Sequence, residues 1–157
     1  MLASLLLAST AASALTMGAN AKSPSKKDFI AKAEGVCATA TKAMSTGFFK
    51  LNPAGADPDE TLKLKFVNQV LLPNMTSQFN SMFKLELPSK DKDVLKNIQV
   101  LANQELANLR KHPDDALFKD PFNQTNLAMA DYGMKGCLRN QPKQQKGISN
   151  GASAQTH

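Results

Sequence analysis

Residues 25–44 read SKKDFIAKAEGVCATATKAM, and this stretch decides the fold class of the chain. Its apolar positions recur at intervals of three and four residues, the period of a helix with one buried face. They are Phe29, Ile30, Ala33, Cys37, Ala40 and Met44. Ser25 and Asp28 have the spacing of a capping box at a helix amino terminus. The pattern predicts a first helix from Ser25, ended by Gly47 and the loop 52–55.

Cys37 falls on the apolar face of this predicted helix, and the only other cysteine is Cys137. An even cysteine count in an exported protein indicates a structural disulfide. Such a bridge would tie the first helix to the last. Catalytic cysteine pairs occur as C-x-x-C, which is absent here, so a redox-active pair is the disfavoured alternative.

Three more amphipathic segments follow the first. The second begins at Asp57-Pro58-Asp59-Glu60 and ends before Pro88, and Pro73 within it predicts a kink or two helices in series. The third runs from Ser89 to His112, and the fourth runs from Asp120 to Cys137. No segment alternates with period two, as strands do. The fold class is therefore predicted to be all-α, an antiparallel bundle of about four helices joined by one disulfide between first and last.

The opening residues have the form of an export signal. Leu2 to Leu15 is uncharged and apolar, and it is followed by Ala19-Asn20-Ala21, an A-x-A cleavage pattern. We interpret residues 1–21 as a signal peptide, residues 22–139 as the bundle domain and residues 140–157 as a disordered basic tail. The protein is then expected to be periplasmic or extracellular. An uncleaved membrane anchor is the alternative, although this run is shorter than the roughly 20 residues of a membrane span.

The formal charge of +6 is concentrated near the two ends of the predicted domain. A bridge between Cys37 and Cys137 would bring these ends together as one basic pole. Its side chains are Lys22, Lys26, Lys27, Lys32, Lys42, Lys135, Arg139, Lys143 and Lys146. A basic pole attracts anionic lipid or an envelope polymer, and the alternative is that it only keeps the protein soluble.

The order of these features resembles that of small exported bacterial helical proteins with two cysteines and no known function. The matching residues are Phe29-Ile30, Ala33 and Cys37, then Leu72-Pro73 and Leu87-Pro88, and finally Tyr132-Gly133 with Cys137. The likeness spans residues 28–138. The lysine-rich surface of this chain differs from the alanine- and acid-rich sequences of the members of that family. The resemblance implies a disulfide-tied helical bundle and no chemistry.

Residues that carry chemistry are sparse. His112 with Asp114 and Asp115 matches no standard metal-ligand spacing, and no nucleophile motif, phosphate loop or haem-attachment motif is present. The sequence therefore predicts a non-enzymatic protein without a metal or cofactor and without specific nucleic-acid recognition. Its expected function is that of an envelope or extracellular interaction module. The alternative is a carrier of a small lipid-like or haem-like ligand, with a cavity opened by the Pro73 kink between Phe66 and Phe79.

Overall fold

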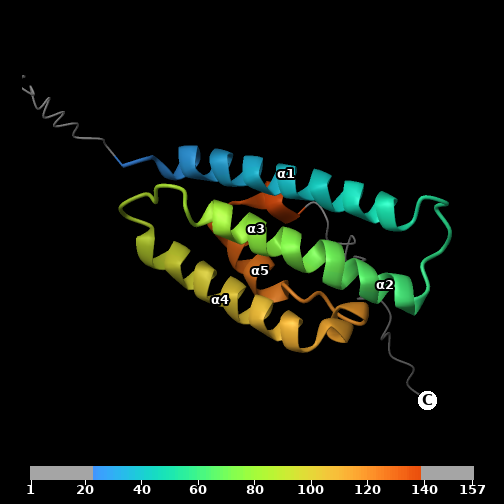
Figure 1. The fold of residues 1–157 in the computed structure, drawn as a ribbon. Coiled ribbons are helices and arrows are strands. Elements are labelled where there is room, and N and C mark those ends of the chain that lie inside the picture. Colours follow the sequence, from blue (N-terminus) through green and yellow to red (C-terminus); the bar gives the residue numbers. More distant parts are fainter. Residues whose placement is uncertain (1–22, 139–157) are drawn as a thin grey trace, which may run out of the picture.

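The computed structural model describes residues 23–138, and within them the chain folds into antiparallel helical rods with no strand (Figure 1). The first rod is α1 (Lys26–Leu51), and the second comprises α2 (Glu60–Phe66), the π-helix η1 (Val67–Leu71) and α3 (Leu72–Met82). The third is α4 (Lys92–Lys111), followed by the 3-10 helix η2 (Pro113–Leu117), α5 (Asn123–Tyr132) and the 3-10 helix η3 (Lys135–Leu138). The predicted all-α bundle of four helices is confirmed.

The amino terminus of α1 is capped as predicted. The Ser25 hydroxyl oxygen accepts a hydrogen bond from the Asp28 backbone N–H at 3.1 Å, and its O–H donates to the Asp28 carboxylate at 2.6 Å. The prediction that Gly47 helps to end this helix is wrong, because α1 continues to Leu51. A Cβ atom at Gly47 would lie 2.6 Å from Val70 Cγ1. The absence of a side chain at Gly47 therefore allows α1 to pack closely against η1.

The second rod carries the disturbance predicted at Pro73. Proline has no N–H, and its ring crowds the carbonyl group one turn earlier. The chain widens into a π turn just before it, where the Leu72 N–H donates to the Val67 carbonyl. Two α-helical segments in series result, and the rod stays continuous through η1 (Figure 1).

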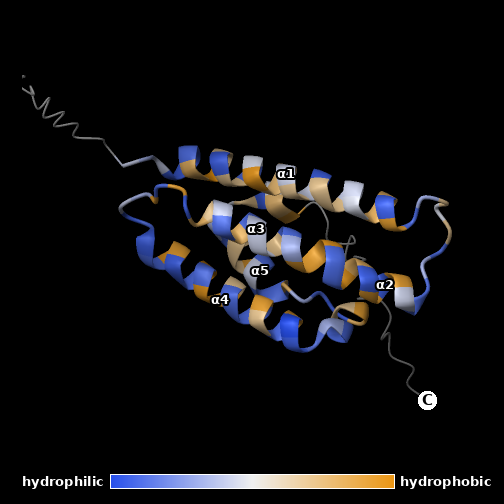
Figure 2. Cartoon of the chain, viewed as in Figure 1, coloured by the Kyte–Doolittle hydropathy of each residue, from blue (hydrophilic) through white to orange (hydrophobic). Residues whose placement is uncertain are grey.

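The core lies between the rods, with apolar residues facing inward and hydrophilic residues recurring along the outer side of each rod (Figure 2). Phe29 of α1 meets the Tyr132 ring edge-on at a centroid distance of 6.1 Å, and Phe79 of α3 meets Phe122 at 5.6 Å. The largest fully buried side chains are Phe29, Phe79, Met82, Leu95, Leu109, Met129 and Met134. Burial of each contributes on the order of 1.5–3 kcal/mol.

The end of the bundle corrects one prediction. The sequence predicts Cys137 on the last helix, but α5 ends at Tyr132 and is capped by Gly133, whose φ of 113° is left-handed. The Gly133 N–H donates to the carbonyl groups of Met129 and Ala130, which closes the helix as a glycine C-cap does. The chain then turns into η3, which carries Cys137. The disulfide therefore joins α1 to η3 and not to the last helix.

Several predicted features lie outside the described residues. These are the signal peptide 1–21, the tail 140–157, and Lys22, Arg139, Lys143 and Lys146. Among the helices of residues 23–138, none is both long and apolar enough to cross a lipid bilayer.

Candidate functional site

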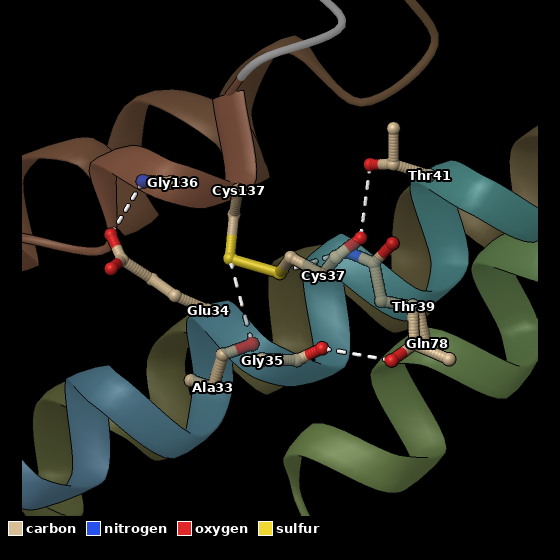
Figure 3. The surroundings of a disulfide bond; sticks show 9 residues. All are labelled: Ala33, Glu34, Gly35, Cys37, Thr39, Thr41, Gln78, Gly136 and Cys137. Atoms are coloured by element: carbon tan, nitrogen blue, oxygen red, sulfur yellow. Dashed lines mark hydrogen bonds between the residues drawn. A yellow bond between two sulfur atoms is a disulfide. The ribbon is translucent and has the colours of Figure 1, made fainter.

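The Cys37–Cys137 bridge joins the middle of α1 to η3 (Figure 3). The two Cα atoms are 5.0 Å apart, and the bridge spans 100 residues of sequence. Cys37 is buried on the inner face of α1, whereas Cys137 is half-buried. The predicted pairing is confirmed, and it places the carboxyl-terminal end of the described chain against the middle of α1.

A second contact holds η3 beside the disulfide. The Glu34 carboxylate, one turn before Cys37, accepts a hydrogen bond from the Gly136 backbone N–H (Figure 3). The Cys137 sulfur also lies 3.9 Å from the Ala33 carbonyl oxygen. A disulfide sulfur carries no hydrogen, so this second approach is a packing contact and only the Glu34 contact is a hydrogen bond.

Gln78 of α3 approaches the same disulfide from the opposite side. Its Nε2 group donates to Cys37 Sγ at 3.4 Å, while its amide oxygen points away from the sulfur (Figure 3). The side chain is only 5% exposed. Within residues 23–138 this is its one side-chain hydrogen bond, and the only fully buried side-chain polar atom without a partner there is Thr125 Oγ1, so Gln78 Oε1 has no protein donor in this range but keeps some contact with solvent.

A cavity of ≈ 440 Å³ lies between α1, the second rod and η2, and Cys137 forms part of its wall. Gln78 and Thr41 line it from α3 and α1, and Asn126 lines it from α5. The remaining wall is mainly apolar, and its large side chains are Met44, Leu71, Met75, Leu117, Phe118 and Phe122. Phe118, at the end of η2, is 84% exposed.

This cavity does not lie where the sequence placed one. Neither Pro73 nor Phe66 or Phe79 lines it. Pro73 borders a separate polar groove with Arg110, and Phe79 is buried in the core. The cavity is lined instead by residues of η1 and η2, two elements that are distant in sequence and in contact in the fold.

The structure divides the predicted basic pole. Lys27, Lys32 and Lys42 are exposed on α1, and Lys135 is exposed on η3. The three α1 lysines fall within a sector of about 140° facing away from the core, and Lys42 lies roughly 15 Å along the axis from Lys32. The one ion pair within residues 23–138 joins Lys119 to Asp115 at 2.8 Å, so these lysines have no carboxylate at salt-bridge distance there.

Asp28 weakens the positive field at the amino terminus of α1. The Ser25 hydrogen bond, helped by the nearby charges of Lys32 and Lys27, holds the pKa of this carboxyl below its usual value. It is therefore ionised at neutral pH. The described part of the chain is also close to neutral, since it holds fifteen of the 19 Lys and Arg and all 13 Asp and Glu.

Lys26 serves the packing of the bundle. Its Nζ atom lies 4.2 Å from the centroid of the Tyr132 ring, a cation–π contact. The Tyr132 hydroxyl donates to Asp91 at 2.9 Å, and burial is the main cause that raises its pKa, so it stays protonated. These contacts join the starts of α1 and α4 to the end of α5. Lys26 therefore contributes to packing within the bundle, unlike Lys27, Lys32 and Lys42.

Sequence reasoning missed Gln78. It lies among Met75, Phe79 and Met82, and its spacing from Met75 and Met82 places it on the buried face of α3. A polar residue at a core position of an apolar stripe is the signal that was available. Its pairing with the disulfide depends on tertiary structure.

The acidic residues near η2 form no metal centre. His112 is exposed, and Asp115 is paired with Lys119. In the described range, no group of three or more His, Cys, Asp or Glu side chains is placed to hold a metal ion. No family model matches this chain, and no curated protein or solved structure matches it either.

Proposed function

We propose that this protein is a non-enzymatic, exported interaction module that binds an anionic lipid or polymer surface through the outer face of α1. The observation that carries the proposal is the set of Lys27, Lys32 and Lys42, exposed and without an ion-paired carboxylate in residues 23–138. Unpaired lysines on one face of a rigid helix can approach a charged plane together. Each lysine near an anionic membrane contributes about 1 kcal/mol.

Export is supported by two features. Disulfides persist in oxidising compartments, and the Cys37–Cys137 bridge has normal geometry for one. The A-x-A pattern at Ala19-Asn20-Ala21 supplies a cleavage site in the sequence. A periplasmic or extracellular location would place the lysine face opposite anionic envelope components. Basic residues outside the described range, Lys22 and those of the tail, would add to the same attraction.

Vesicle sedimentation tests the proposal with the full mature chain. We expect binding to phosphatidylglycerol vesicles, little binding to phosphatidylcholine vesicles, and a steep loss of binding as salt rises. Changing Lys27, Lys32 and Lys42 together to Gln should weaken binding about 100-fold. The matched control changes three exposed lysines elsewhere, Lys63, Lys65 and Lys96, in the same way.

Two results would contradict the proposal: equal binding to both vesicle types, or equal weakening by the control set. A parallel titration with dextran sulfate identifies the source of the negative charge. Retention of dextran sulfate binding without vesicle binding would assign the face to a polymer. Vesicle binding alone would assign it to lipid.

A second candidate function is carriage of a small apolar ligand. It is favoured by one observation, the cavity of ≈ 440 Å³ walled by Met44, Met75, Phe118 and Phe122. Ligand cavities in proteins typically measure about 300–1,000 Å³ and combine an apolar lining with a few polar groups. This cavity has both properties.

A further inference from the structure

We propose that the cavity beside the disulfide binds an uncharged, mostly apolar molecule that presents one hydroxyl or N–H group to Gln78 Oε1. This inference rests on the second candidate function and adds the chemical class of the ligand. It is independent of the lysines on α1, because none of Lys27, Lys32 and Lys42 lines the cavity.

The polar end of the ligand is set by Gln78. The side chain is 5% exposed, and its Nε2 group is already committed to Cys37 Sγ. The oxygen of the same amide points away from the sulfur and has no protein donor in residues 23–138 (Figure 3). An acceptor without a protein donor on a mainly apolar wall favours a donor on the ligand, because a polar group of the ligand that enters the cavity needs a partner to replace its hydrogen bonds to water.

The residues that line the cavity indicate the chemistry of the apolar part of the ligand. Met44 and Met75 contribute flexible thioethers, Cys137 contributes a disulfide sulfur, and Phe118 and Phe122 contribute aromatic rings. Sulfur and aromatic groups are polarizable, and thioethers make favourable contacts with aromatic rings. The wall therefore suits an aromatic or unsaturated molecule.

The charged groups at the cavity have partners, which disfavours an ionic ligand. Lys119 is paired with Asp115 at 2.8 Å. Asp120 accepts hydrogen bonds from the Phe122 backbone N–H at 2.9 Å and from Asn126 Nδ2 at 3.0 Å. A ligand charge would lose its hydration here without a free counter-charge on the wall.

Phe118 lies on the rim of the cavity. It is 84% exposed although it is a large apolar side chain, and a bound ligand would cover part of its ring. Phe49, at the end of α1, is a matched comparison because it is 68% exposed and does not line the cavity. Comparing alanine variants at Phe118 and Phe49 therefore distinguishes the loss of a ligand contact from a general effect of removing an exposed aromatic ring.

The probe is N-phenyl-1-naphthylamine, a neutral fluorophore with two aromatic systems and one N–H group. Titration into the oxidised full chain should give saturable enhancement of its fluorescence. Phe118→Ala should weaken binding about fivefold or more, through lost apolar contact area. Phe49→Ala should leave the affinity unchanged.

Competition tests the polar anchor. 1-Naphthol and naphthalene differ by one hydroxyl group, so each is used to displace the probe from the parent chain and from Gln78→Met. In the variant, 1-naphthol should bind about fivefold more weakly, the effect of one neutral hydrogen bond, and naphthalene should bind as before. Since Gln78 is buried, circular dichroism must first show that the variant is folded. If it is not, the Phe118 and Phe49 variants, both at exposed positions, still decide the proposal.

Absence of saturable probe binding to the folded full chain would overturn the proposal, and so would equal effects of Phe118→Ala and Phe49→Ala. Equal losses for both competitors in Gln78→Met would overturn the polar anchor. Binding only by a chain ending at residue 139 would identify the tail as the natural occupant, and that also overturns the proposal. Probe binding without vesicle binding, or the reverse, distinguishes failure of this inference from failure of the lysine-face proposal.

Discussion

Two glycines of α1 show how the surroundings of a residue decide its role. Gly47 faces Val70 so closely that a Cβ atom would lie 2.6 Å from its Cγ1, and Val70 is itself buried. A Cβ atom at Gly35 would meet nothing within 4 Å. Both glycines carry the same intrinsic cost in a helix, so their difference in effect comes from packing alone.

Gly47→Ala is expected to destabilise the protein by about 1–3 kcal/mol, because the added methyl group overpacks the contact with Val70. Gly35→Ala in the same helix should stabilise it by roughly 0.5–1 kcal/mol, the gain in helix propensity. Urea unfolding followed by circular dichroism measures both free energies. A stabilising Gly47→Ala would show that α1 and η1 can separate at no cost.

At the scale of elements, α5 depends on α4 for its amino terminus. The backbone N–H groups of Gln124 and Thr125 donate to the two carboxylate oxygens of Glu105, at 3.0 and 3.1 Å. The first turn of any helix has N–H groups without partners in the helix itself, and a carboxylate there also complements the helix dipole. A side chain from the neighbouring helix thus replaces the usual N-cap.

Glu105→Ala should therefore lower the free energy of unfolding by about 1–2 kcal/mol, as loss of an N-cap does. Gln104→Ala, at an exposed neighbouring position on α4, is the control and should have little effect. Amide hydrogen exchange localises the change, since the amides of Gln124 and Thr125 should lose protection first. Unchanged exchange at these two amides would contradict the role assigned to Glu105.

For the whole molecule, the disulfide is the strongest restraint on the unfolded chain. It closes 100 residues between α1 and η3, and nearly the whole described bundle lies inside that loop. In the chain-entropy account, a loop of this length is worth on the order of 4–5 kcal/mol, and measured gains are often smaller. The Glu34–Gly136 hydrogen bond holds the same two elements in the folded state.

Reduction should therefore lower the urea midpoint and the melting temperature of the parent chain markedly. The double variant Cys37→Ser with Cys137→Ser should start at the reduced value and show no response to the reductant. Thermal unfolding with and without a phosphine reductant provides the comparison. Equal melting temperatures for oxidised and reduced parent chain would refute the stabilising role of the bridge.

Much of this architecture follows from local sequence. The three- and four-residue spacing around Phe29 and Cys37 predicted α1 and its buried face, and the Ser25 cap marked its start. The disturbance at Pro73 was predictable because proline lacks an N–H group. The disulfide was predictable because the chain holds two cysteines and no others. These signals act within a few residues, or by elimination, and need no knowledge of packing.

Tertiary structure alone decided the rest. Gly47 is typical of a helix end in sequence but lies at a helix contact, because only the folded bundle brings Val70 against it. Cys137 lies on η3 because Gly133 took a left-handed conformation and closed α5 one turn earlier. The cavity, with Gln78 on its wall, arises where segments from α1, α3 and η2 meet. Local propensity determines which residues form helices. Contacts between residues far apart in sequence determine which of their side chains are buried in the core and which remain accessible to a ligand or partner.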